Sequence, residues 1–250
     1  MALTDSLIEY WAFDEASGDR TGEHNSLVLT DNNTVASATG LVYSLAADFE
    51  ADNNEYLSRS DDSNMSTGDI DFTFAVWFKA ETTTQNRSIL VKGNASSYEY
   101  RISKNASAQM QFAVCTNLFE TGLTTLTESS FGAIDTDWHF LVCWHDATGA
   151  SSTGANTIAI VIDDGTVDST SHSGGSFDSS LDFEVGRWAA QPDEWDGLLG
   201  PLMFWKRCLT SAEITQLYNS GAGLTYAAFT GGAAVALDPM GVSGFFGLEA

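Results

Sequence analysis

The chain has 250 residues, 43% of them apolar and 12% aromatic, so it can bury a sizeable hydrophobic core in one domain. Ten lysines and arginines stand against 34 aspartates and glutamates, and the formal net charge of −24 leaves no basic surface for nucleic acid. No segment approaches the ~18 consecutive apolar residues that a membrane-spanning helix needs. The N-terminus lacks a signal-peptide pattern, so we expect neither secretion by that route nor membrane insertion.

Short alternating or apolar runs, separated by Gly, Ser, Asn and Asp, predict many short strands rather than helices. Residues 19–40 are polar and predict a long, loosely structured crossing. In the clearest strand, 71–79, four apolar side chains share one face, and Trp77 on the other face predicts that this face is covered too. Asp163-Asp164-Gly165 predicts a tight hairpin. The strands are expected at 7–13, 45–49, 55–57, 71–79, 88–91, 98–102, 110–114, 138–144, 157–162 and 181–186.

A late strand at 195–205 runs into one short helix at 210–221. Thr210 or Ser211 is a suitable N-cap with Glu213 close behind, and Gly221 suits the end of the helix. No long helical period appears earlier, which excludes alternating α/β architecture. The sequence therefore predicts an all-β fold, a two-sheet antiparallel jelly-roll sandwich with one short C-terminal helix.

Several motifs occur in one order along residues 7–222, and together they resemble the laminin-G-like branch of the concanavalin A-like lectin/glucanase superfamily, to which pentraxins are similar. The resemblance implies the same jelly roll, with the short helix packed at the sandwich edge. The motifs are Tyr10-Trp11-x-Phe13-Asp14-Glu15, Phe72-Thr-Phe74-x-Val-Trp77, Ile89-Leu-Val-Lys92-Gly93, Asp137-Trp138-His139, Val161-Ile-Asp163-Asp-Gly165, Val185-Gly186-Arg187 and the stretch from Trp195 to Gly221.

Catalytic residues are not evident. Retaining glucanases of the superfamily need two acids about 5–5.5 Å apart, and the nearest pair here is Asp182 and Glu184, which we interpret as the polar face of a strand. None of the four histidines lies in a hydrolase motif, and His139 and His145 flank a strand. We expect that the protein is not an enzyme, with glycoside hydrolase as a remote alternative.

Binding residues are predicted in the loop before the late strand. Trp188 and Trp195 bracket this loop and offer aromatic faces for a sugar ring, with Gln191 and Asp193 as polar partners. Asp193 and Glu194 are also candidate ligands for calcium, the possible cofactor. Gly200 and Pro201 stand where relatives tend to carry an acidic residue near a structural calcium, so that site is not expected.

Two units are predicted, a jelly roll at 1–222 and a Gly/Ala-rich apolar tail at 223–250 that docks on its own domain or on a neighbouring subunit. We expect a non-enzymatic module on a multi-subunit particle, such as a bacteriophage head decoration or fibre protein made in the host cytoplasm. Its partners would be other copies, capsid or fibre subunits and cell-surface glycans. The alternative is a free carbohydrate-binding lectin, possibly calcium-dependent, either cytoplasmic or exported by a non-standard route.

Overall fold

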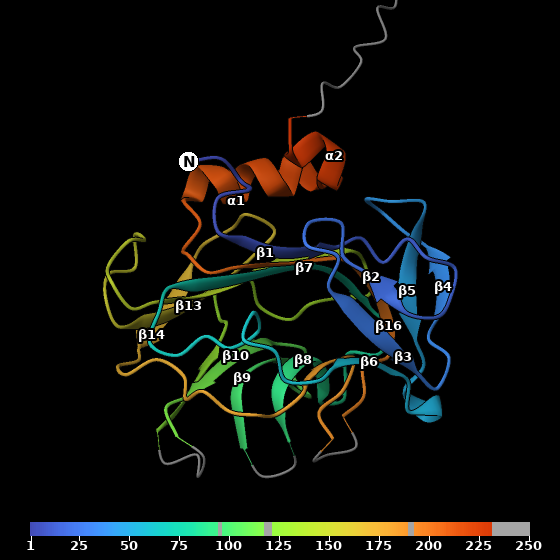
Figure 1. Cartoon of the computed structure of the whole chain (residues 1–250), viewed down its shortest axis with the longest axis horizontal. Helices are drawn as coiled ribbons and strands as arrows, with labels where there is room; N and C mark the ends of the chain where they lie inside the picture. The colour runs from blue at the N-terminus through green and yellow to red at the C-terminus, as the bar shows by residue number, and fades with distance from the viewer. Residues whose placement is uncertain (95–96, 118–121, 190–192, 232–250) are drawn as a thin grey trace, which may run out of the picture.

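The computed structural model describes residues 1–94, 97–117, 122–189 and 193–231, and in these ranges the chain forms two stacked antiparallel sheets (Figure 1). The first sheet has the order β14 (Asp168–Ser171), β13 (Thr157–Ile162), β12 (His139–Asp146), β7 (Phe72–Ala80), β16 (Gly197–Trp205), β5 (Leu45–Phe49) and β4 (Ala36–Thr39), and β1 (Leu7–Trp11) also pairs with β16. The second has the order β11 (Leu123–Thr127), β10 (Met110–Cys115), β9 (Ser97–Lys104), β8 (Arg87–Asn94), β15 (Phe183–Val185), β6 (Tyr56–Arg59), β3 (Val28–Asn32) and β2 (Arg20–Thr21). The predicted all-β jelly-roll sandwich is confirmed.

Residues 19–40 are not the loosely structured crossing that their composition predicts. They form β2 and β3 in the second sheet and β4 in the first sheet. These strands are short and partly exposed, and Leu29 is the buried residue of β3. An edge strand with one wet face needs few apolar residues, so its composition resembles that of a loop.

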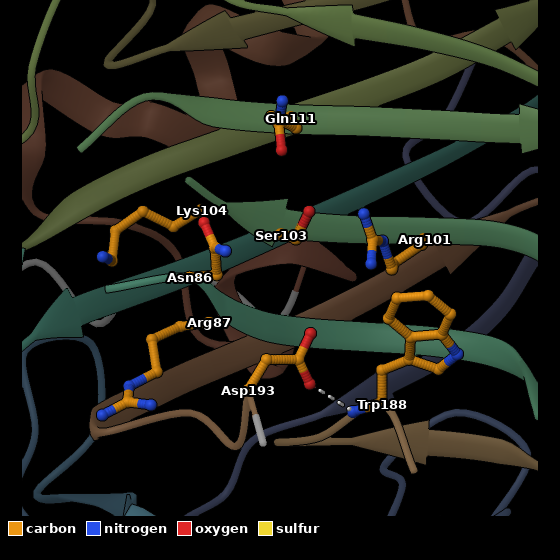
Figure 2. A pocket seen from close by; sticks show the side chains of 8 residues that line it. All are labelled: Asn86, Arg87, Arg101, Ser103, Lys104, Gln111, Trp188 and Asp193. Atoms are coloured by element: carbon orange, nitrogen blue, oxygen red, sulfur yellow. Dashed lines mark hydrogen bonds between the residues drawn. The ribbon is translucent and has the colours of Figure 1, made fainter. Parts of the chain in front are cut away.

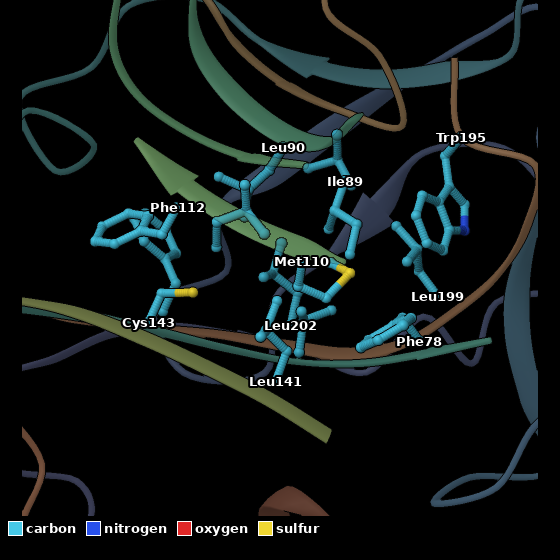
Figure 3. Close-up of a cluster of buried hydrophobic side chains, with 14 of the residues drawn as sticks. Phe78, Ile89, Leu90, Met110, Phe112, Leu141, Cys143, Trp195, Leu199 and Leu202 are labelled. Atoms are coloured by element: carbon cyan, nitrogen blue, oxygen red, sulfur yellow. The ribbon is translucent and has the colours of Figure 1, made fainter. Parts of the chain in front are cut away.

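The main core lies between the two sheets, where side chains from their facing sides interdigitate (Figure 3). Phe74 of β7 stacks on Phe204 of β16, with ring centroids 4.3 Å apart and planes 8° apart. Cys143 lies in this core as a free thiol, and burial raises its pKa well above the usual value. Stacked, fully buried aromatic rings of this size contribute strongly to stability.

A second apolar layer covers the outer face of the first sheet. Trp77 points into it and is 2% exposed, which confirms the covered second face of the predicted strand. The helices α1 (Ser211–Tyr218) and α2 (Tyr226–Phe229) supply Ile214, Leu217 and Phe229 to this layer (Figure 1). The short helix therefore lies across a sheet face, not at the sandwich edge as the resemblance implied.

The predicted helix start is confirmed in detail. The Thr210 hydroxyl accepts a hydrogen bond from the Glu213 amide at 3.3 Å, and the Glu213 carboxylate accepts one from the Thr210 amide at 2.8 Å. This reciprocal pair satisfies two backbone donors that the first turn of a helix otherwise leaves unpaired. The Arg207 guanidinium pairs with the same carboxylate at 2.8 Å and fixes the connection from β16.

The backbone geometry at the predicted hairpin and at an irregularity in β16 explains the residues found there. At the predicted hairpin, Asp163 and Asp164 both have φ near +55°, and the Gly165 amide donates to the carbonyl of Ile162. The pairing of β16 with β7 shifts at Gly200 and Pro201. A Cβ at Gly200 would lie 3.0 Å from the Cβ of Trp77, so the close approach of β16 to β7 at this point favours glycine.

The 3-10 turns η1 (Ala51–Asn53) and η2 (Asn219–Gly221) complete the described elements. Residues 223–231, the first part of the predicted tail, lie against the outer layer through α2, and residues 232–250 lie outside the described ranges. None of the helices in the described ranges combines the length and the apolar character needed to cross a membrane.

Candidate ligand-binding pocket

A pocket of about 360 Å³ opens on the outer face of the second sheet (Figure 2). Along β9 and β10 the side chains alternate, so that Ile102 and Phe112 enter the core while Arg101, Ser103 and Gln111 point to the other side. Sheet pairing sets Ser103 between Ser88 of β8 and Gln111 of β10. The lining residues are Asn86, Arg87, Arg101, Ser103, Lys104, Gln111, Trp188 and Asp193.

The pocket is cationic although the protein is strongly acidic. Arg87, Arg101 and Lys104 are three of the ten lysines and arginines in the whole chain. Asp193 is the one carboxylate among the lining residues, so their formal charges sum to +2. Figure 2 shows Arg101 with Trp188 at one end of the pocket and Arg87 with Lys104 at the other.

Two aromatic rings hold the Arg101 guanidinium. Its central carbon lies 4.4 Å from the Trp188 ring centroid and 5.2 Å from that of Tyr98, and the two rings are nearly perpendicular, at 82°. The Trp188 indole is itself fixed, because its Nε1 donates a hydrogen bond to the carbonyl of Asn94 at 2.7 Å. Stacking on its face leaves the edge of a guanidinium free to donate hydrogen bonds.

Asp193 ties the loop that carries Trp188 to the sheet. Its Oδ2 accepts a hydrogen bond from the Ser88 hydroxyl at 2.6 Å, and its Oδ1 accepts one from the Trp188 amide at 3.2 Å (Figure 2, dashed line). The Ser88 amide donates to the Asp193 carbonyl at 2.7 Å. Burial raises the pKa of Asp193, against the opposing effects of the Ser88 hydrogen bond and the Arg101 charge.

Several buried donors in the pocket have no partner. The Nε atoms of Arg87 and Arg101 and the hydroxyl of Ser103 make no hydrogen bond within the described residues. Arg87 is 8% exposed and Ser103 is 4% exposed, so bulk water has little access to them. Leaving a buried donor unsatisfied costs about 1–3 kcal/mol, and a ligand that supplies acceptors removes that cost.

Lys104 is the titratable cation of the pocket. Its Nζ donates a hydrogen bond to the carbonyl of Gln85 at 2.5 Å. Burial, and then the positive charge of Arg87, lower the pKa of Lys104 to about 8, while the Asp196 carboxylate acts in the opposite direction. Arg87 also faces Asp196, with Nη2 3.9 Å from the carboxylate.

The structure separates the four predicted ligand-binding residues. Trp188 and Asp193 line the pocket, whereas Gln191 lies outside the described residues. Trp195 cannot form a sugar platform, because it is fully buried in the main core with its ring edge-on to Phe78 (Figure 3). Its amide donates to the Gly186 carbonyl just before β16 begins, and this fixes the chain where the indole enters the core.

Sequence reasoning missed Arg87, Arg101, Ser103 and Lys104. A signal was present, because Arg101 lies within the predicted strand 98–102 at a position that points away from the core. The face of Trp188 toward Arg101 is covered by the guanidinium, so a sugar ring cannot stack on that face as predicted.

The surroundings of Asp193, one of the two candidate calcium ligands, do not suit calcium. Both carboxylate oxygens of Asp193 already accept hydrogen bonds, and Arg87 and Arg101 line the same pocket. A hard cation needs several oxygens free to coordinate it, without neighbouring positive charges.

A separate carboxylate group at Glu50, Glu81 and Asp196 has oxygens within 4.8 Å of one another. Burial, and then the negative charges of neighbouring carboxylates, raise the pKa values of Glu50 and Glu81.

Glu184 and His139, which were considered for catalysis, have structural partners. The Glu184 carboxylate pairs with Arg187 at 2.6 Å, and the Arg187 guanidinium in turn lies over the Tyr56 ring. His139 is held between Asp163 at 2.7 Å and Asp135 at 3.2 Å, next to the hairpin turn. Neither Asp182 nor Glu184 lines any of the four pockets found in the described residues.

Residues 51–215 match a laminin-G family model described as the concanavalin A-like lectin/glucanases superfamily. The chain belongs to this family. The resemblance found in the sequence motifs is thereby confirmed, and the laminin-G-like domain is the frame on which the pocket is built. A comparison with the curated proteins gave no match.

Solved structures share the fold at low identity. The binding domain of Paraclostridial Mosquitocidal Protein 1 superposes with a TM-score of 0.70 at 13% identity, over 88% of this chain and 53% of that one. Domain 4 of the arabinanase AbnA from Geobacillus stearothermophilus, solved with arabinotriose, gives 0.59 at 15%, over 84% and 97%. A structure of botulinum neurotoxin type C, whose cell entry depends on interaction with two ganglioside molecules, gives 0.64 at 12%, over 87% and 52%. The chain thus spans about half the length of the toxin structures.

Proposed function

We propose that the chain is a non-enzymatic carbohydrate-binding module and that a saccharide binds in the pocket on the outer face of β8, β9 and β10. The observation that carries the proposal is Arg101, which two aromatic rings orient beside the unpartnered hydroxyl of Ser103. Asn86 and Gln111 add amide donors and acceptors to the same surface. Planar polar side chains around a concave site of a few hundred Å³ suit the hydroxyl groups of a sugar.

The family match and the solved structures agree with this proposal, but its main support is the geometry of the pocket. The family is named for lectins and glucanases, and AbnA domain 4 was solved with a bound oligosaccharide. The described residues bring no pair of carboxylates together in the pocket, since Asp193 is its single acid. Binding therefore has more support than hydrolysis, which requires two acids placed around the scissile bond.

Glycan binding is tested by titration calorimetry and a glycan array with the full chain and two variants. Arg101→Gln removes the oriented guanidinium, and we expect any glycan retained by the natural protein to be lost. Lys79→Gln removes one positive charge from β7 of the other sheet and is expected to bind normally. Absence of binding to every glycan by the natural protein contradicts the proposal.

A chelator arm tests calcium dependence in the same assay. We expect the same affinity with and without the chelator, because the pocket offers guanidinium, ammonium, amide and hydroxyl groups rather than free carboxylates. Loss of binding on chelation would restore the calcium-dependent lectin that the sequence left open.

For the biological setting we propose display on a multi-subunit particle, such as a bacteriophage virion, with the segment 223–250 as the attachment. Its support is the Gly/Ala-rich apolar composition of that segment, which differs from a solvated linker. Native mass spectrometry of the full chain distinguishes this setting from a free lectin. A protein that stays monomeric at all concentrations, with or without its tail, favours the free lectin.

A further inference from the structure

We infer that the ligand of this pocket is an acidic saccharide, one whose carboxylate binds at Arg101. The inference rests on the proposed function and goes further, because it names the chemical class of the sugar. Uronic acids and sialic acids are the two common sources of such a carboxylate.

The inference rests on the balance of hydrogen-bond donors and acceptors among the residues that line the pocket. The Arg101 guanidinium lines the pocket, and unpartnered donors lie on Arg87, Arg101 and Ser103. Its one carboxylate, Asp193, already accepts hydrogen bonds at both oxygens. A neutral sugar hydroxyl donates as well as accepts, whereas an ionised carboxylate only accepts. A surface with three cationic donors and a single carboxylate, which already accepts hydrogen bonds, is complementary to the carboxylate of a ligand.

Arg101 is the cation best placed to receive it. Among the described residues Arg101 makes no ion pair, while Arg87 faces Asp196 at 3.9 Å and the Lys104 ammonium donates to Gln85. The guanidinium plane is set by Trp188 and Tyr98, so little side-chain freedom is lost when a ligand binds. A guanidinium edge binds a carboxylate through two parallel hydrogen bonds, a geometry that an ammonium group does not offer.

The net charge of the whole protein further restricts the class of acidic saccharide that can bind. With a net charge of −24, the chain repels a densely charged polyanion before it reaches the pocket. A short saccharide with isolated carboxylates experiences little of this repulsion, because charges beyond about 10 Å are screened at 0.1 M salt. The local sum of +2 then acts on the carboxylate at short range.

The test uses two matched ligand pairs on the full chain by titration calorimetry. Trigalacturonic acid is compared with its methyl ester, and 3′-sialyllactose with its methyl ester, so that each pair differs mainly in carboxylate charge. We expect at least one acid to bind 10-fold or more tightly than its neutral counterpart. The Arg101→Gln variant is expected to lose about 10- to 100-fold in affinity for that acid, whereas Lys79→Gln stays within twofold.

Each other result overturns the inference. Equal affinity for acid and neutral partner removes the acidic class but leaves carbohydrate binding standing. The same applies if no acid binds while neutral glycans are retained on the array. An acid that binds natural protein and the folded Arg101→Gln variant equally well places the carboxylate elsewhere. Retention of no glycan at all contradicts the proposed function itself. The comparison of acid with ester on the natural protein needs no variant, so it stands even if Arg101→Gln unfolds.

Discussion

A buried ion pair between β8 and β9 gives the clearest test of what stabilises the fold. Lys92 of β8 and Glu99 of β9 are both fully buried, with Nζ and Oε1 2.6 Å apart. The same ammonium contacts the Asp61 carboxylate at 3.0 Å and the Ser179 carbonyl at 2.8 Å. Four segments therefore meet at one positive charge, and removal of that charge leaves Glu99 without its buried cationic partner.

The Lys92→Met variant keeps most of the side-chain volume and removes the charge. Breaking a buried pair from one side costs about 3–5 kcal/mol, which in a domain of this size corresponds to a melting temperature lower by roughly 6–20 °C. The double variant Lys92→Met, Glu99→Gln removes both charges and keeps an acceptor for the Ser179 amide, which bonds Glu99 Oε1 at 2.8 Å. We expect it to recover at least half of the lost free energy of unfolding.

The pH dependence gives an independent check by urea unfolding at pH 7 and pH 5. Burial raises the pKa of Glu99 in the folded protein, and Lys92 opposes that effect. Without Lys92 the pKa rises further, so Glu99 takes up a proton more readily in the folded than in the unfolded state. The destabilisation of Lys92→Met therefore shrinks as the pH falls, since the neutral acid tolerates burial. Equal losses in the single and double variants, unchanged between the two pH values, would refute this reasoning.

Three further predictions concern the pocket, the second helix and the acidic group. The affinity for an acidic saccharide is expected to fall as pH rises through about 8, because Lys104 loses its proton there. Calorimetry from pH 6.5 to 9 measures this decrease, and the Lys104→Gln variant is expected to lack this pH dependence. Phe229→Ala costs about 3–5 kcal/mol in urea unfolding, because Phe229 is 6% exposed in the outer layer; a loss below about 0.5 kcal/mol contradicts docking of α2. Glu81→Gln raises stability by a few tenths of a kcal/mol at pH 7 and not at pH 4, because burial, and then the negative charges of Asp48 and Asp196, raise the pKa of Glu81. An equal gain at both pH values contradicts this cause.

The core strands were predictable because their side chains alternate strictly. Phe72, Phe74, Val76 and Phe78 enter one core, and the opposite face carries Trp77, which required the second layer that α1 and α2 supply. The helix start was also predictable, since the capping pair is local in sequence. The polar edge strands β2, β3 and β4 were not, because partial exposure removes the apolar alternation that identifies a strand.

The pocket could be predicted only in part. Trp188 and Asp193 were found because both lie in one short loop, but the direction of Trp195 depends on where β16 enters the sheet. Arg101, Ser103 and Gln111 become neighbours through the register of β8, β9 and β10, which the sequence alone does not specify. A site built across strands therefore stays hidden when each strand is analysed by itself.

The contrast between the acidic protein and its cationic pocket has a consequence for salt dependence. A basic protein that binds a polyanion loses affinity steeply as salt rises, because counterions are released on binding. Here the long-range field of the −24 charge opposes an acidic ligand, while the attraction arises from Arg101 and its neighbours inside the pocket. Added salt screens the distant repulsion more than the short contacts. Affinity for a mono-carboxylate saccharide such as 3′-sialyllactose is therefore expected to change less than threefold between 50 and 300 mM salt. A steep decrease would show that long-range attraction, absent from this charge distribution, drives the binding.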